Sequence, residues 1–239
     1  MSTQLTIINH IGELRSRLLK SFVALLLASI ACFFYSREIF SILQKPMMSS
    51  LPEGSHFIAT SAFESYVTYF KVALLSGFFL SAPYIFYQFW RFVAPGLKTG
   101  EKNLAFPFSV ASGLLFTGGA LFGYFVIFPP GFDAMNSILQ GTGIQFLPSM
   151  SDYFKTMTSL LLMFGVTFEL PLLVFILGKM GLITYKEIKT FRRYVIVGLF
   201  ALSAILTPDT TGIFQVLLSL PLWVLYELGG LSLLLIKKK

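Results

Sequence analysis

The chain has 239 residues, of which 55% are hydrophobic and only 12% are charged, and its formal net charge is +7. Soluble domains carry about twice that charged fraction, so the composition excludes an ordinary soluble domain. The long uncharged runs instead predict an all-α membrane protein that crosses the bilayer several times. No alternation of strand period recurs over segments of about ten residues, which argues against a β-barrel.

The amino-terminal segment predicts an amphipathic helix that precedes the first span. Within residues 3–20, apolar residues recur at helical spacing on one stripe, at Ile7, Ile11, Leu14 and Leu18. A helix of this kind is expected to lie at the membrane interface. The first span should follow at about residues 18–35.

Six apolar runs predict six spans in a single polytopic domain that covers residues 1–239. The expected spans are, in chain order, residues 18–35, 67–90, 104–128, 153–177, 194–207 and 213–228. The connection 36–65 is long for a loop, so we expect it to contain helix and to pack on the membrane domain. Pro129-Pro130-Gly131 should end the third helix, and the spacing of Gly119 and Gly123 should allow close helix packing.

The fifth span is short. Only 15 residues separate Arg193 from Asp209, which is about 23 Å of helix. The hydrocarbon core is about 30 Å thick, so the bilayer should thin here or partner helices should shield the segment.

The distribution of basic residues predicts the orientation. With six spans, 14 of the 18 lysines and arginines fall on the side that holds both termini. Because cytoplasmic loops are enriched in these residues, both termini are predicted to be cytoplasmic. The net charge of +7 is largely this topology signal and indicates no nucleic-acid partner.

Glu169 is the only ionisable residue in the apolar run 156–177. A carboxylate at membrane depth costs on the order of 2.5–3.5 kcal/mol, so it normally faces a protein interior or a wet cavity and indicates a functional site. Pro171 cannot donate a hydrogen bond to the carbonyl of Thr167, so it should bend or loosen the helix beside Glu169. The simpler interpretation is a glutamate that hydrogen-bonds to neighbouring helices.

Glu13 and Glu101 stand out on the basic cytoplasmic side. Each has an ordinary explanation, because Glu13 can pair with Arg17 one turn away and Glu101 can stabilise the start of the third span. As a pair they would suit a cationic ligand, since carboxylates bind guanidinium groups through two hydrogen bonds. Phe92, in the same loop as Glu101, would add an apolar contact.

No catalytic pattern is present. The sequence has no nucleophile elbow, phosphate loop or HExxH motif. Cys32 is the single cysteine, and His10 and His56 lie far apart. The sequence therefore predicts neither an enzyme nor a cofactor or metal site.

Six short motifs follow one another along nearly the whole chain. They are His10-Ile-Gly-Glu-Leu-Arg15, Ser81-Ala-Pro83 leading to Tyr87-Gln-Phe-Trp90, Phe92-Val-Ala-Pro-Gly-Leu97 with Glu101, Phe164-Gly-Val-Thr-Phe-Glu169-Leu-Pro171, Arg193-Tyr194 and Leu206-Thr-Pro208. In this order and on this topology they resemble the TatC family, the core integral-membrane subunit of the twin-arginine protein translocase. The chain departs from the family's T-P-P-D pattern at Thr207-Pro208-Asp209, which lacks one proline.

The resemblance implies a receptor for signal peptides with two consecutive arginines, in the prokaryotic cytoplasmic membrane. It also implies single-span TatA-like and TatB-like partners, an oligomeric complex, and export of folded proteins driven by the proton-motive force. The signal-peptide-binding residues it implies are Glu13, Glu101, Phe92, Arg15, Pro95 and Leu97. The short fifth and sixth spans would dock a partner helix, with intramembrane polar contacts at Glu169, Gln215 and Thr207. Structural roles are expected for Pro46, Pro83 and Pro171.

Two other functions remain open from the residues alone. One is a proton- or ion-coupled transporter of small solutes that uses Glu169, and the other is a scaffold subunit without a ligand. Against the transporter, the sequence has no matching halves and no second charge near mid-depth. Glu227 is the nearest candidate, and it falls toward the cytoplasmic end.

Overall fold

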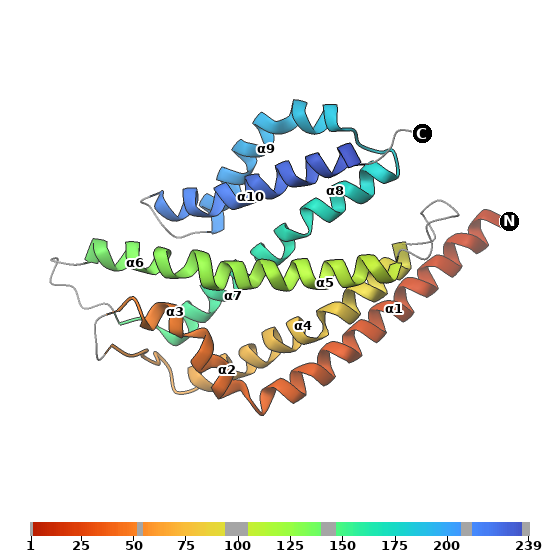
Figure 1. Cartoon of the computed structure of the whole chain (residues 1–239). Helices are drawn as coiled ribbons and strands as arrows, with labels where there is room; N and C mark the ends of the chain where they lie inside the picture. The colour runs from red at the N-terminus through yellow and green to blue at the C-terminus, as the bar shows by residue number, and fades with distance from the viewer. Residues whose placement is uncertain (1, 52–54, 94–104, 140–146, 207–211, 236–239) are drawn as a thin grey trace. The chain divides into compact units, whose positions relative to one another are not determined.

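The computed structural model of the chain describes residues 2–51, 55–93, 105–139, 147–206 and 212–235. Over these residues the fold is helical (Figure 1), and its one β feature is an isolated parallel bridge between Ile58 and Ser149. The all-α class is therefore confirmed. The α-helices are α1 (Ser2–Phe33), α2 (Ser36–Leu43), α3 (Lys45–Met48), α4 (Glu64–Val93), α5 (Ala105–Phe122), α6 (Phe128–Leu139), α7 (Met150–Phe168), α8 (Leu170–Lys179), α9 (Tyr185–Leu206) and α10 (Ile213–Ser232).

Four helical segments in the described part of the chain are long and apolar enough to cross a membrane. They are His10–Phe33, Glu64–Val93, Ala105–Ser137 and Met150–Lys179. The fifth and sixth predicted spans lie in α9 and α10, which have 22 and 20 residues. The first turns of α9 contain the basic residues Lys186, Lys189, Arg192 and Arg193, which the expected spans place in the preceding loop. The apolar part of α9 is therefore shorter than the helix. The six-span expectation is consistent with this arrangement.

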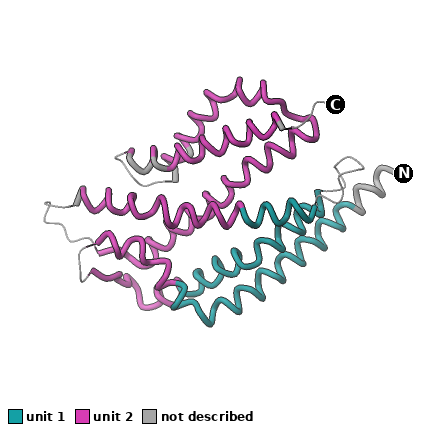
Figure 2. The backbone as a smooth tube through the Cα atoms, in the orientation of Figure 1, with its two compact units in different colours: residues 1–39, 69–114 teal, residues 40–68, 115–239 magenta. Residues whose placement is uncertain are grey.

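Backbone contacts divide the chain into two compact units (Figure 2). Unit 1 comprises Met1–Ile39 and Tyr69–Leu114, and unit 2 comprises Phe40–Thr68 and Leu115–Lys239. Unit 1 thus holds α1, most of α4 and the first half of α5. The α2 helix is divided equally between the two units, and α3 and the helices from α6 onward belong to unit 2. The single domain expected over the whole chain stays a prediction.

Small residues bring the helices of unit 1 together. A Cβ placed on Gly77 of α4 would lie 2.3 Å from Ser29 Oγ of α1, so the two helices pack closely there. On the other side of α4, the buried Trp90 donates from Nε1 to Ser112 Oγ of α5 at 2.8 Å. Trp90 therefore fixes the carboxyl-terminal end of α4, which carries the candidate site.

The amino-terminal segment differs from its prediction. The expected interfacial helix and first span form one helix, α1, from Ser2 to Phe33 without a break. The junction Arg17-Leu-Leu-Lys-Ser-Phe22 contains no proline or glycine and is rich in good helix formers, so nothing in it interrupts the backbone hydrogen bonds. The site residues of the first motif consequently lie on the same continuous helix as the first span.

The expectation that Pro129-Pro130-Gly131 ends the third helix is wrong. A π-helical turn, Gly123–Ile127, connects α5 to α6, and the helix continues to Leu139. The Phe128 amide donates to the Gly123 carbonyl five residues back. This wider turn starts a new helical segment at Phe128, and prolines are tolerated in a first turn because no partner is needed for their missing amide hydrogen.

Glycines also allow close packing in unit 2, as predicted. A Cβ on Gly119 of α5 would lie 2.5 Å from the backbone oxygen of Phe164 in α7. One on Gly123 would lie 2.8 Å from Cδ2 of the same phenylalanine. Phe164 is fully buried. The spacing of Gly119 and Gly123 therefore serves packing within one chain.

The long connection after the first span contains helix, as expected, and from Phe40 onward it is part of unit 2 and packs within it. The hydroxyls of Tyr124 and Tyr153 donate to the carbonyls of Ile42 and Leu43 at the end of α2, each at 2.6 Å. Pro46 is buried in the first turn of α3. Its carbonyl accepts hydrogen bonds from the hydroxyls of Ser49 and Ser50, both at 3.1 Å.

Candidate functional site

Glu13 forms an ion pair with Arg17 one turn along α1. Arg17 donates from Nε to Glu13 Oε1 at 3.0 Å, and its Nη2 donates to the same oxygen. The pairing predicted from the i, i+4 spacing is therefore present. The Glu13 side chain nevertheless remains 36% exposed, whereas that of Arg17 is only 15% exposed. The carboxylate thus faces solvent while its partner is largely covered.

Residues of α4 complete this cluster on α1. The Arg17 Nη1 donates to Gln88 Oε1 at 3.3 Å, and Gln88 is buried. One turn before Glu13, the ring of His10 stacks on Phe92 with centroids 4.4 Å apart and planes 20° apart. His10 Nδ1 lies 3.9 Å from Glu13 Oε2. Phe92 is therefore joined to the Glu13 cluster through the ring of His10.

Other predicted site residues fall elsewhere. Arg15 is exposed on α1. Glu101, Pro95 and Leu97 lie outside the described residues, as does Thr207. The described part of the candidate site consequently consists of one partly exposed carboxylate in a cluster with a histidine, an arginine, a glutamine and a phenylalanine.

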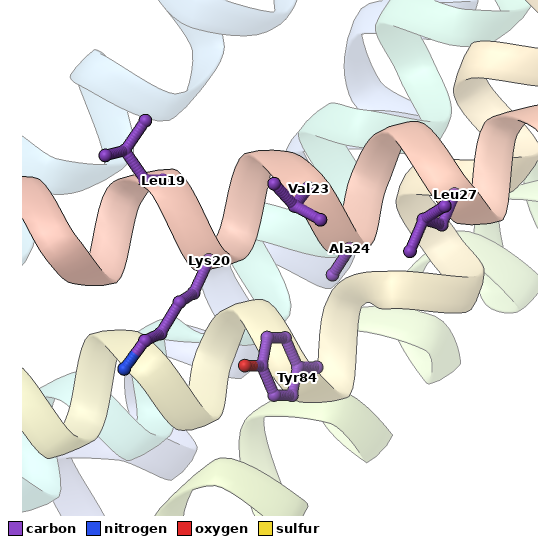
Figure 3. A pocket seen from close by; sticks show the side chains of 6 residues that line it. All are labelled: Leu19, Lys20, Val23, Ala24, Leu27 and Tyr84. Atoms are coloured by element: carbon purple, nitrogen blue, oxygen red, sulfur yellow. The ribbon is translucent and has the colours of Figure 1, made fainter.

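A shallow groove follows the same two helices of unit 1 (Figure 3). It has a volume of about 410 Å³ and is lined by Leu19, Lys20, Val23, Ala24, Leu27 and Tyr84. Its lining is apolar except for the Lys20 amino group and the Tyr84 hydroxyl. In Figure 3 the Tyr84 hydroxyl points toward the side on which the Lys20 side chain extends. Exposed apolar residues of α1, among them Ile11, Leu14 and Leu18, precede the groove along the helix.

Glu169 lies at a break between two helices. The α7 helix ends at Phe168, α8 begins at Leu170, and Glu169 lies between them, only 6% exposed. Pro171 occupies the first turn of α8. The interruption predicted from Pro171 is therefore present. The carboxylate is buried within unit 2, as a charge-capable group at membrane depth requires.

Gln215 lies in the first turn of α10 and contacts α9. Its Nε2 donates to the Phe200 carbonyl of α9 at 2.9 Å. An apolar groove of about 260 Å³ runs between the same helices. It is lined by Ile196, Leu199, Phe200, Val216, Ser219, Leu220 and Trp223. Of these, Leu220 and Val216 are 57% and 52% exposed, so the groove is open to the surroundings.

Glu227, the second carboxylate weighed for a transporter, has a partner. Arg192 Nη2 donates to Glu227 Oε2 at 2.6 Å. The hydroxyl of the neighbouring Tyr226 donates to the Ile188 carbonyl at 2.8 Å. These contacts hold the start of α9 against α10, which is a structural use of Glu227.

Glu64 has contacts that were not predicted from the sequence. Its carboxylate accepts from the amide and hydroxyl of Thr60, from Ser149 Oγ at 2.9 Å and from the Ser151 amide at 2.7 Å. It thereby ties the start of α4 to the start of α7. The Thr60–Glu64 spacing was the one local signal, because the serines lie more than 80 residues away. No group of three or more metal-ligating side chains occurs among the residues that the structure describes.

Comparison with known proteins decides the family. The model of the family described as Sec-independent protein translocase protein (TatC) matches residues 9–221. The chain belongs to the TatC family. TatC proteins of Desulforapulum autotrophicum and Aquifex aeolicus are 37% and 38% identical to it, over 96% and 92% of this chain and 84% and 91% of theirs.

Solved structures give the same result. Two crystal structures of the twin-arginine translocase receptor TatC match with TM-scores of 0.80 and 0.83, each at 37% identity. They cover 95% and 96% of this chain, and 98% and 100% of their own. This TatC-family chain is therefore a multi-pass protein of the prokaryotic cytoplasmic membrane. Its role is in Sec-independent protein transport.

Proposed function

We propose that this TatC-family chain is the receptor that binds twin-arginine signal peptides at its cytoplasmic face. The observation that carries the proposal is the partly exposed Glu13 carboxylate, which lies on the continuous helix α1 beside His10 of the His10–Phe92 stack. Arg17 donates to Oε1 of Glu13, and Oε2 faces His10 at 3.9 Å. A carboxylate offers about four acceptor positions, so Oε2 retains capacity for an incoming guanidinium.

Glu101 supplies the second carboxylate in this proposal. Two arginines need two acceptors, because each guanidinium binds a carboxylate through parallel hydrogen bonds. Arg15, Pro95 and Leu97 complete the proposed contact surface. The relatives named as twin-arginine translocase receptors support this ligand class.

The test is a binding titration with purified protein in lipid nanodiscs. A labelled twin-arginine signal peptide and its twin-lysine counterpart are titrated against wild type, Glu13→Gln and Glu101→Gln. Glu187→Gln is the matched control, because Glu187 is an exposed glutamate at the start of α9 that contacts Thr184. We expect each site variant to bind the twin-arginine peptide about tenfold more weakly. Wild-type binding by both variants would refute the assigned site.

We also propose that single-span TatA-like and TatB-like subunits dock on α9 and α10 in an oligomeric complex. The open apolar groove beside Gln215 supports this, since a short span leaves apolar surface for a partner helix. Leu220→Trp should fill the groove and reduce co-purification of the partners while peptide binding persists. Val197→Trp is the control, because Val197 is an exposed residue of α9 outside the groove lining.

In the same proposal, peptide binding is followed by export of the folded protein, with energy from the proton-motive force. Glu169 serves this later step. Its burial at the α7–α8 break supports a role separate from recognition at Glu13. A proteoliposome assay in which export stops when the proton gradient is dissipated, while peptide binding continues, tests this division.

A further inference from the structure

We propose that Arg17 is a positioning residue that, with Gln88, fixes the plane of the Glu13 carboxylate for an incoming guanidinium. This inference deepens the proposed receptor function and rests on it. The simplest interpretation is that Arg17 neutralises Glu13 as its ion-pair partner. In that case the Glu13 carboxylate would have no role in binding a ligand. The geometry of the cluster indicates the opposite.

The contacts of Arg17 are one-sided. Both of its hydrogen bonds to Glu13 end on Oε1. A guanidinium that neutralised the carboxylate fully would bind the two oxygens in parallel, one hydrogen bond to each. Since Arg17 grips one oxygen with two donors, it restrains the carboxylate and leaves Oε2 toward the His10–Phe92 side.

Arg17 is itself held in place. Its side chain is only 15% exposed, and Nη1 donates to the buried Gln88 of α4. Two residues further along α4, Trp90 hydrogen-bonds to Ser112 of α5. The last turns of α4 are therefore anchored to α5 through Trp90, and they hold Arg17 through Gln88. Arginine suits this role because its planar fork makes several hydrogen bonds in fixed directions.

The consequence concerns selectivity. An arginine ligand gains over a lysine ligand when the carboxylate has a fixed plane, because only the guanidinium needs two aligned acceptor directions. A freely rotating Glu13 would still attract both cations. Arg17 should therefore raise the preference for arginine over lysine more than it raises the affinity for positive charge.

The experiment compares the dissociation constants of a twin-arginine and a twin-lysine signal peptide for wild type, Arg17→Gln, Arg17→Lys and Gln88→Leu. We expect both Arg17 variants to lose about tenfold of the arginine preference, and Gln88→Leu to lose about threefold. Arg17→Lys keeps the positive charge and removes the planar guanidinium. It therefore distinguishes the effect of hydrogen-bond geometry from the effect of charge. Lys20→Gln is the control, because Lys20 is an exposed cation on the same helix and contributes to the neighbouring groove.

The ratio of the two constants guards against misfolding, since a misfolded fraction removes binding of both peptides alike. An unchanged ratio in both Arg17 variants would overturn the inference. So would tighter twin-arginine binding by Arg17→Gln, which would make Arg17 a competitor of the ligand. If wild type itself does not prefer the twin-arginine peptide, the proposed receptor function fails instead.

Discussion

Glu64 and Ser149 are 85 positions apart in sequence, and the serine hydroxyl donates to the glutamate carboxylate at 2.9 Å. Ser149 is also the residue that caps the start of α7, where its hydroxyl accepts from the Asp152 amide. The same carboxylate accepts from the Ser151 amide. The Glu64 side chain thus links the end of the segment that follows the first span to the first turn of α7.

Replacing Glu64 should destabilise unit 2 without affecting peptide binding. Glu64→Ala removes both carboxylate oxygens and leaves the donors of Thr60, Ser149 and Ser151 without this acceptor. We therefore expect a clearly lower unfolding temperature in detergent. Glu64→Gln keeps one acceptor oxygen and should have a smaller effect. Asp133→Asn, an exposed site on α6, is the control. An unfolding temperature of Glu64→Ala equal to that of wild type would contradict the assigned contacts.

The glycine contacts of α5 make a paired prediction. Gly119→Ala places a methyl group 2.5 Å from the Phe164 backbone oxygen and must push α5 and α7 apart, at a cost of about 1–3 kcal/mol. Gly118 has open space around it, so Gly118→Ala should be neutral or stabilising by about 0.5–1 kcal/mol. Unfolding by denaturant measures both. Equal effects of the two substitutions would argue against close packing at Gly119.

Glu169→Gln should separate recognition from export. Because Glu169 is buried at the α7–α8 break, the substitution keeps the side-chain volume and removes only the ionisable group. We expect unchanged binding of the signal peptide and at least a severalfold slower export in proteoliposomes. The control is Glu187→Gln. Export at the wild-type rate would show that an ionisable group is not needed at this position.

The Arg192–Glu227 pair should couple energetically. Arg192→Ala and Glu227→Ala should each lower the unfolding free energy, and the double variant should cost less than their sum by about 1 kcal/mol. Both side chains are partly exposed, at 40% and 21%, so the expected coupling is modest. A double-mutant cycle in denaturant measures it. Strict additivity would mean that the ion pair contributes nothing to stability.

Local chemistry was readable from the sequence, and distant contacts were not. Pro171 lacks an amide hydrogen whatever its surroundings, so the break beside Glu169 was predictable. The Glu13–Arg17 pair followed from helical spacing. In contrast, Gln88 lies 71 residues from Arg17, and no local pattern indicates that the two meet.

Two errors have the same origin. Pro129 and Pro130 normally indicate a helix end, and only the π-helical turn before them lets the helix continue. The polarity of the first 20 residues suggested a separate interfacial helix, yet polarity does not interrupt backbone hydrogen bonds. Hydropathy indicates where a chain meets lipid, whereas backbone geometry decides where a helix ends.

The most direct test of the central claim is photocrosslinking from a signal peptide that carries a photoreactive residue beside its arginine pair. We expect crosslinks to α1 near His10 and Glu13, to Phe92 at the carboxyl-terminal end of α4, and to the segment around Glu101. These should disappear with excess unlabelled twin-arginine peptide and persist with the twin-lysine form. Crosslinks confined to α9 and α10, or equal competition by both peptides, would contradict recognition of the arginine pair at Glu13.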